Sequence, residues 1–181
     1  MKKRLFCILL ALTMTAARAA CGEGNKDPGG QGTGVPAAPT QSAGGQTDAG
    51  GYTFTVSKAD NYVVAIDDDM ADVLKALGEP LSFFEAASCA FEGMDKTYTY
   101  SGFVITTRPD GEKDYVNSIR LTDDSVVTSE GVYIGCSADD VTAAYGEGSR
   151  TENVISYTKG NTAMNFVLEG GKVISIEYLA A

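Results

Sequence analysis

Two sets of side chains in this 181-residue chain have the types and spacing to bind a metal ion or to form a covalent bond. Asp67, Asp68 and Asp69 are consecutive carboxylates, and Ca²⁺ prefers several oxygen ligands of this kind. Cys89 and Cys136 are thiols that can form a disulfide in an oxidising compartment. The first set suggests a weak calcium site, and the second suggests a cross-link.

Both sets also have a structural interpretation. The acidic run precedes a predicted helix, where carboxylates cap the backbone, and it lacks the spacing of a calcium-binding loop. We therefore favour capping, predict no metal or other cofactor, and keep calcium at Asp67, Asp68 and Asp69 as the alternative. Cys89 and Cys136 lie in different parts of the chain, so the sequence leaves their disulfide open.

The chain has no histidine, which excludes the histidine-dependent catalytic triads and histidine-ligated zinc sites. A nucleophilic cysteine would have no histidine to activate it. Acidic residues are plentiful, but no pair stands out as the carboxylates of a hydrolase, so hydrolysis is the least favoured class. We predict no catalytic residues and a protein that is not an enzyme.

Tyr98, Tyr100 and Phe103 surround a predicted strand turn, and three more phenylalanines precede them within residues 81–96. Exposed aromatic side chains anchor many binding surfaces, so these three form the candidate binding face. Packing in the core of a sheet is the alternative interpretation.

Charge narrows the choice of partners. Residues 51–181 contain 21 of the 24 acidic residues and 9 of the 14 basic residues, a net charge of −12. Such a field repels nucleic acid and other polyanions. We therefore expect an extracytoplasmic protein as partner, with weak binding of glycan or calcium as the alternative.

The N-terminal segment has the pattern of an exported protein. Residues 1–20 combine a basic start with an apolar run over 5–17 that is too short to span a bilayer, as in a signal peptide. Arg18-Ala19-Ala20-Cys21-Gly22 resembles the lipobox of bacterial lipoproteins, in which the cysteine receives diacylglycerol. That motif prefers leucine where this chain has Arg18. We predict lipid attachment at Cys21 on the outer face of the cell membrane, with cleavage after Ala19 and secretion as the alternative.

Residues 21–50 are rich in Gly, Ala, Thr, Gln and Pro, which predicts a disordered tether after the lipidated cysteine. Residues 51–181 form the predicted folded domain. It begins with strands over 52–56 and 62–66, which the five intervening residues would join as a hairpin.

Two short predicted helices have the same kind of start and stop signals. The first is predicted to begin at the N-cap Asp69, with Asp72 completing a capping box, and to end at Gly78. The second begins at Ser137, with Asp140 in the reciprocal position, and ends at Gly146. Apolar residues recur on one side of each helix, so both need a sheet to pack on.

Strands are predicted over 97–101, 103–107 and 115–121 after the first helix, and over 154–158, 162–168 and 173–179 after the second. Met164, Phe166 and Leu168 share one face of a strand, and Ile174, Ile176 and Tyr178 share one face of the next. One packed face and one wet face are typical of an antiparallel sheet with helices on one side.

The chain also repeats itself. Residues 66–78 match 134–146 at an offset of 68, whereas the strands that follow match at an offset of 57. The first copy therefore has about 11 extra residues, within 81–96. The predicted fold class is α+β, a tandem αβββ repeat over about 62–121 and 131–179. Two short helices pack on one face of an antiparallel sheet, and the β-hairpin precedes them.

The second copy reads Ile-Gly-x-Ser-x-x-Asp-Val-x-x-x-Tyr-Gly, then Tyr-x-Lys-Gly and Val-x-Ser-Ile-x-Tyr. These motifs resemble the repeat of uncharacterised surface lipoproteins of Gram-positive bacteria, whose architecture is similar to the β-lactamase-inhibitor protein and to SmpA/OmlA-type assembly lipoproteins. The resemblance covers residues 52–179. It implies a fold whose open sheet face binds a protein, but none of the inhibitor's functional residues maps onto this chain.

These observations predict a membrane-anchored lipoprotein that acts as a protein-binding module, inhibitory or assembly-related, without catalysis. Binding would use the open sheet face or residues 81–96. A structural protein of the cell envelope that binds glycan or calcium weakly is the alternative.

Overall fold

The structure, a computed structural model, describes residues 50–181. The predicted signal peptide, the predicted lipid-attachment residue Cys21 and nearly all of the predicted tether lie outside the described residues. Within them, ten strands and two helices follow in the order β1 (Thr53–Val56), β2 (Tyr62–Ala65), α1 (Met70–Leu77), β3 (Ser82–Ala87), β4 (Met94–Tyr100), β5 (Phe103–Asp110), β6 (Lys113–Leu121), α2 (Ala138–Tyr145), β7 (Ser149–Thr151), β8 (Val154–Lys159), β9 (Thr162–Glu169) and β10 (Lys172–Ala180).

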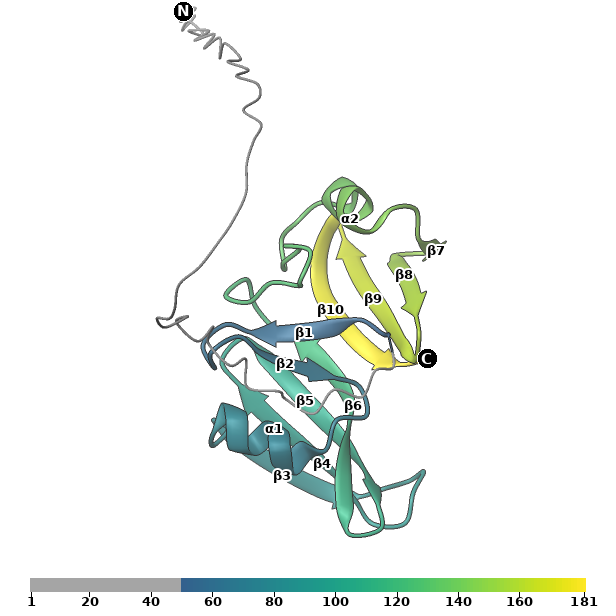
Figure 1. Ribbon diagram of the computed structural model, residues 1–181. Helices are drawn as coiled ribbons and strands as arrows, with labels where there is room; N and C mark the ends of the chain where they lie inside the picture. The colour runs from purple at the N-terminus through teal and green to yellow at the C-terminus, as the bar shows by residue number, and fades with distance from the viewer. Residues whose placement is uncertain (1–49) are drawn as a thin grey trace, which may run out of the picture. The chain divides into compact units, whose positions relative to one another are not determined.

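The strands form two antiparallel sheets (Figure 1). β1 and β2 pair as a two-stranded hairpin, as the sequence predicts. The other eight strands form one sheet in the order β3-β4-β5-β6-β10-β9-β8-β7. This order is a palindrome, because two four-stranded meanders meet through their last strands, β6 and β10.

The predicted fold class is wrong. The described chain is mostly β rather than α+β, and four strands rather than three follow each helix. The strands missing from the prediction are β3 and β7, at the two edges of the sheet. Their sequences, Ser-Phe-Phe-Glu-Ala-Ala and Ser-Arg-Thr, carry little alternation. Pairing with the adjacent strand holds them extended, so tertiary context decides their structure.

The predicted ends of both helices are confirmed, and one predicted bond is not. The Asp69 side chain accepts a hydrogen bond from Ala71 N (3.0 Å) at the start of α1. Ser137 and Asp140 form the reciprocal capping box of α2. In α1, the second carboxylate oxygen of Asp69 bonds Lys113 Nζ (2.8 Å), and the described chain contains no return bond from Asp72.

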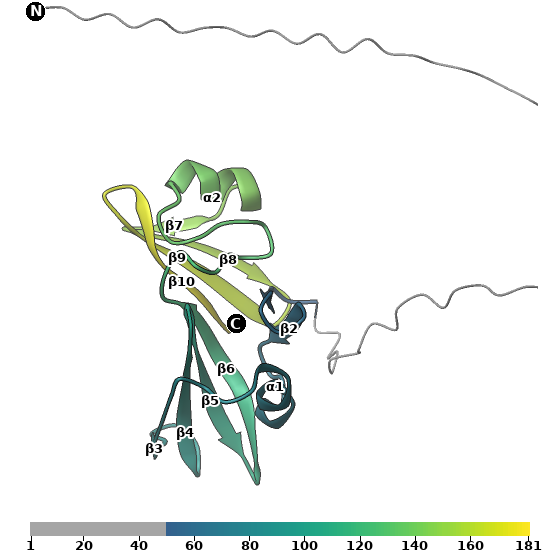
Figure 2. The ribbon, with the colours of Figure 1, turned by 90° about the vertical axis from the view of Figure 1, so that its left-hand side faces the viewer.

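One hydrophobic core lies on the inner face of the large sheet. It combines residues of the hairpin, of both helices and of the strands, among them Phe54, Val73 and Val141, which are fully buried. Figure 2 shows the hairpin and α1 on the same side of β4, β5 and β6. The inner face is thereby covered, and the opposite face is open.

The open face carries small polar side chains. Thr106 Oγ1 lies 2.6 Å from Ser118 Oγ, and Ser156 Oγ donates to Asn165 Oδ1 at 2.7 Å. Met164, Phe166 and Leu168 are buried on the inner face, as predicted, but Ile174 is 47% exposed. A bulge between Val173 and Ser175 shifts the alternation, so Val173 is buried in place of Ile174.

The two halves make equivalent backbone contacts just before their helices. In the first half, Asp67 N donates to Val116 O and Val116 N to Asp68 O, both at 2.9 Å. In the second half, Gly135 N donates to Val173 O at 2.8 Å and Val173 N to Cys136 O at 2.9 Å. Each helix is therefore joined to the last strand of its own half by the same pair of bonds.

Candidate functional site

The three consecutive carboxylates bind different partners. Asp67 accepts hydrogen bonds from Arg108 Nη2 and Asn161 Nδ2, both at 3.0 Å. Asp69 caps α1, and its bonds to Lys113 and then to Ala71 N lower the pKa of its carboxyl. The capping interpretation is therefore confirmed for Asp69. Residues 50–181 contain no group of three acidic or cysteine side chains placed to hold a metal ion.

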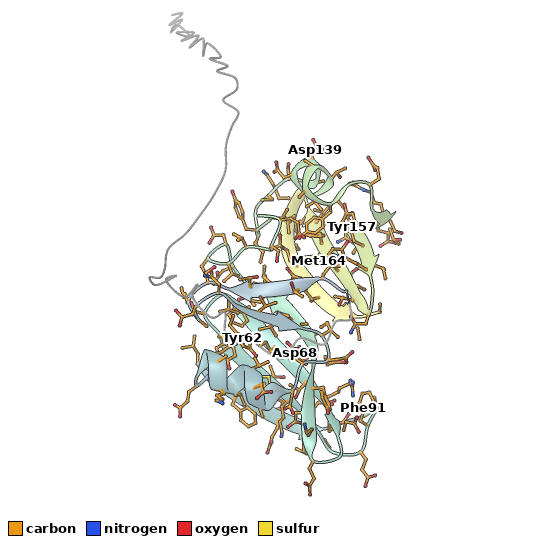
Figure 3. All side chains as sticks on the ribbon, viewed as in Figure 1. Tyr62, Asp68, Phe91, Asp139, Tyr157 and Met164 are labelled. Carbon is orange, nitrogen blue, oxygen red and sulfur yellow. The ribbon has the colours of Figure 1, made fainter. Side chains whose placement is uncertain are left out.

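Asp68 lies between these two and is partly buried. Its Oδ2 accepts a hydrogen bond from Ala65 N (2.8 Å), which ties the end of β2 to the start of α1. Burial raises the pKa of the Asp68 carboxyl, although the bond from Ala65 lowers it in part. Figure 3 shows Asp68 near Tyr62 of the hairpin.

The structure does not bring the two cysteines together. Cys89 is exposed in the connection between β3 and β4, and Cys136 is buried just before α2. Both are free thiols.

The candidate binding face of Tyr98, Tyr100 and Phe103 is not a surface. All three side chains are buried, and the most exposed of them, Tyr100, is 8% exposed. Tyr100 stacks on Phe103 with ring centroids 5.1 Å apart, and its hydroxyl donates to Gly78 O at 3.2 Å. All three point to the covered side of the sheet, so the alternative interpretation, core packing, describes them.

Exposed apolar side chains gather instead on the segment just before them. Nine large hydrophobic residues of the described chain are exposed, and five of these lie in residues 81–94. These five residues are Leu81, Phe83, Phe84, Phe91 and Met94. Together with the rest of strand β3, they form the surface that we call the β3 edge. Leu81 is 76% and Phe84 64% exposed.

Phenylalanines lie on both sides of β3. Phe83 is opposite Tyr98 on the helix side, with ring centroids 5.1 Å apart. Phe84 is opposite Thr97 and therefore projects from the open face. Phe91, in the β3–β4 connection, has its ring centroid 6.0 Å from the guanidinium carbon of Arg108. Figure 3 shows Phe91 beside the ends of the strands that lie far from α2.

β3 also presents free backbone groups. Just beyond the β3–β4 ladder, Ser88 N donates to Gly93 O, so Ser88 directs its backbone groups at the neighbouring strand. In an antiparallel pair, alternate residues direct both backbone groups at the partner strand. By this alternation, Ser82, Phe84 and Ala86 bond β4, while Phe83, Glu85 and Ala87 direct their N–H and C=O groups outward.

The opposite edge of the sheet differs. β7 has three residues, Ser149, Arg150 and Thr151, all exposed and none of them apolar. A short, charged strand is a common way to keep an edge from pairing with other chains. β3 is twice as long and carries Lys and Arg at none of its positions.

A shallow cleft lies between the β3–β4 and β5–β6 turns. It has a volume of about 200 Å³, and its lining includes Glu85, Glu112 and Asp114. Lys96 Nζ lies 2.6 Å from Asp114 Oδ2, so this carboxylate is engaged in an ion pair.

Residues 81–96 were predicted from the sequence as a candidate binding surface, and the three phenylalanines in this segment were candidates for exposure to solvent. Its weak strand pattern hid the fact that this segment forms an edge strand. The signal that was available is the Phe-Phe pair between Pro80 and Ser88 with no cation nearby. Adjacent aromatics on a strand must point to opposite faces, so one of the two cannot enter a one-sided core.

Comparisons with protein-family models and with curated proteins find no match. Among solved structures, an extracellular protein containing an SCP domain, from Bacillus anthracis str. Ames, is 13% identical, with a TM-score of 0.39. The match covers 80% of this chain and 50% of that chain, so this chain spans about half of that protein's length. A likeness this low carries no argument about fold or function. Within residues 50–181, no helix has the length and apolar character needed to cross a membrane.

Proposed function

We propose that this protein is an extracytoplasmic binding module that engages another protein through the β3 edge. The observation that carries the proposal is the concentration of five of the nine exposed large apolar side chains of the described residues in and around one edge strand, within residues 81–94. Natural sheets normally protect their edges, and clustered apolar surface is typical of interaction sites. A partner that covers the β3 edge would bury these side chains and satisfy the outward backbone groups of β3.

The experiment compares the wild-type full chain with two variants as baits in detergent-solubilised cell envelope. Phe84→Lys places a charge at the centre of the β3 edge, and Ile174→Lys makes the same change at an apolar side chain with 47% exposure in the other half. A bound protein should be lost with Phe84→Lys and retained with Ile174→Lys. Equal capture by all three baits, with native circular dichroism spectra, would refute the role of the β3 edge.

The proposal includes a lipid anchor at Cys21, which rests on the sequence pattern of residues 1–22. Expressed in a Gram-positive host, the wild-type chain should enter the detergent-rich phase of a phase-separating detergent, and Cys21→Ser should stay in the aqueous phase. Release of the wild-type chain into the culture medium would instead support the secreted alternative.

A further inference from the structure

We infer that the occupant of the β3 edge is an extended segment of another protein that carries Lys or Arg alternating with apolar residues. This inference rests on the proposed function and specifies its partner. It adds two statements: the partner pairs with the backbone of β3 as an extra strand, and its charge is positive.

The backbone geometry supports an added strand. Phe83, Glu85 and Ala87 direct their N–H and C=O groups away from β4, so a strand placed beside β3 finds donors and acceptors at the spacing of a sheet. Strand addition to an exposed edge is a recurring mode of peptide recognition. Side chains of the incoming strand would alternate between Phe83 and Glu85 on the helix side and Phe84 on the open side.

The local charge selects the partner. Residues 76–95 contain no Lys or Arg, and their four acidic side chains, Glu79, Glu85, Glu92 and Asp95, are all exposed. The cations that flank this stretch are Lys75, in the last turn of α1, and Lys96, which lies opposite Glu85 on β4 and is paired with Asp114 at 2.6 Å. Apolar side chains within a surface of net negative charge favour a segment that is both cationic and apolar.

The same charges disfavour a second copy of this chain as the occupant. A symmetric antiparallel pair of β3 strands centred on residue 85 places the two Glu85 side chains directly opposite, and like charges there are destabilising. Centring the pair on residue 84 or 86 leaves them on a diagonal of about 7–8 Å, which is within the Debye length of about 8 Å at physiological salt. Two folded domains of net charge −12 add their general repulsion.

Synthetic peptides test the inference on the full chain in a neutral detergent. The first is a labelled twelve-residue peptide of alternating Lys and Val, and the second has Glu in place of Lys. A third has the Lys-Val sequence with every backbone amide methylated, which removes the donors along both edges of the strand and keeps the charge. Fluorescence anisotropy measures binding, and added salt should weaken it.

Two protein variants and one matched control complete the test. Glu85→Gln removes the central charge and should weaken binding of the Lys-Val peptide by up to about five-fold, as expected for one exposed ion pair. Glu169→Gln, the same change at the exposed end of β9 in the other half, should leave the affinity unchanged. Ala87→Pro deletes one outward N–H without removing a bond to β4, and should weaken binding of the same peptide.

The inference is supported if the Lys-Val peptide binds, the other two peptides bind at least ten-fold more weakly, and both variants reduce affinity. It is overturned if the Lys and Glu peptides bind equally, if methylation has no effect, or if no peptide binds. It is also overturned if sedimentation shows a dimer of the chain that Phe84→Lys dissociates. If the peptides fail while envelope capture still depends on Phe84, the proposed function stands and only the partner class is wrong.

Discussion

Replacing Tyr178 with phenylalanine should stabilise the protein. The Tyr178 side chain is 1% exposed, and within the described chain its hydroxyl has no hydrogen-bond partner. Burial raises the pKa of this hydroxyl, as expected when nothing replaces the water it loses. The equivalent position in the first half is Leu121, which is equally buried and has no polar atom. The hydroxyl therefore contributes a desolvation cost without a compensating bond.

The magnitude follows from the asymmetry of buried hydrogen bonding. An unsatisfied buried polar group costs about 1–3 kcal/mol, whereas a formed hydrogen bond contributes about 1 kcal/mol net. Tyr178→Phe keeps the ring and its contact with Phe54 at 6.1 Å between centroids. We expect the free energy of unfolding to rise by about 1 kcal/mol, which for a domain of this size raises the Tm by about 3–4 °C.

A second tyrosine provides the matched control. Tyr157 is also buried, but its hydroxyl donates to Gly146 O at 2.8 Å, at the end of α2. Tyr157→Phe removes the same atom where it has a partner and leaves that carbonyl unsatisfied. This variant should lose about 1 kcal/mol, so the two substitutions should differ by about 2 kcal/mol with opposite signs.

Urea unfolding followed by circular dichroism measures both variants against the wild type, with equal m-values as the condition for comparison. A loss of stability in Tyr178→Phe similar to that in Tyr157→Phe would refute the reasoning. That result would mean that the Tyr178 hydroxyl has a partner in solution, such as a bound water molecule.

Three further predictions concern the helices and one close contact. Asp68→Asn keeps the acceptor for Ala65 N but removes a partly buried charge. Burial raises the pKa of the Asp68 carboxyl in the folded state, so its ionisation destabilises the wild-type fold. This destabilisation is absent below the unfolded-state pKa and develops as the pH rises through the folded-state pKa. In thermal melts, the variant should therefore match the wild type near pH 3 and have a higher Tm at pH 7. Ser137→Ala removes the capping box of α2 and should cost about 1 kcal/mol in urea unfolding; no change would mean that packing alone holds this helix end. Gly148→Ala places a methyl group 2.7 Å from Tyr157 Cζ and should cost about 1–3 kcal/mol, and an unchanged Tm would contradict the close packing of this turn.

Local chemistry made part of this fold predictable. Asp69 and Ser137 cap the helices, and Gly78 and Gly146 end them, because these signals act over a few residues and need no distant partner. The buried alternation of Met164, Phe166 and Leu168 was visible for the same reason.

Features that depend on distant pairing were not predictable. β3 and β7 are strands because β4 and β8 pair with them, and their own sequences give little sign of it. The bulge after Val173 exchanges the faces of Val173 and Ile174, which a strict alternation cannot anticipate.

The candidate site was found only in part. Residues 81–96 were recognised as a candidate surface, but the binding face was assigned to Tyr98, Tyr100 and Phe103, on the two strands further in, β4 and β5. Aromatic residues are equally suited to a core and to an interface, so residue type alone cannot separate the two. The position of a strand within the sheet decides between them, and that position is set by pairing.

The palindromic strand order has a consequence for how the chain folds. The β6–β10 ladder joins residues 118–121 to 176–179, whereas all the remaining ladders of the eight-stranded sheet join strands that are neighbours in sequence. Its closure must bring distant segments together, and loop-closure entropy delays such contacts. We expect each meander to form first and the two to merge last. Pulse-labelled hydrogen exchange during refolding should protect amides within each meander before those between β6 and β10, and simultaneous protection would show that the domain folds as one unit.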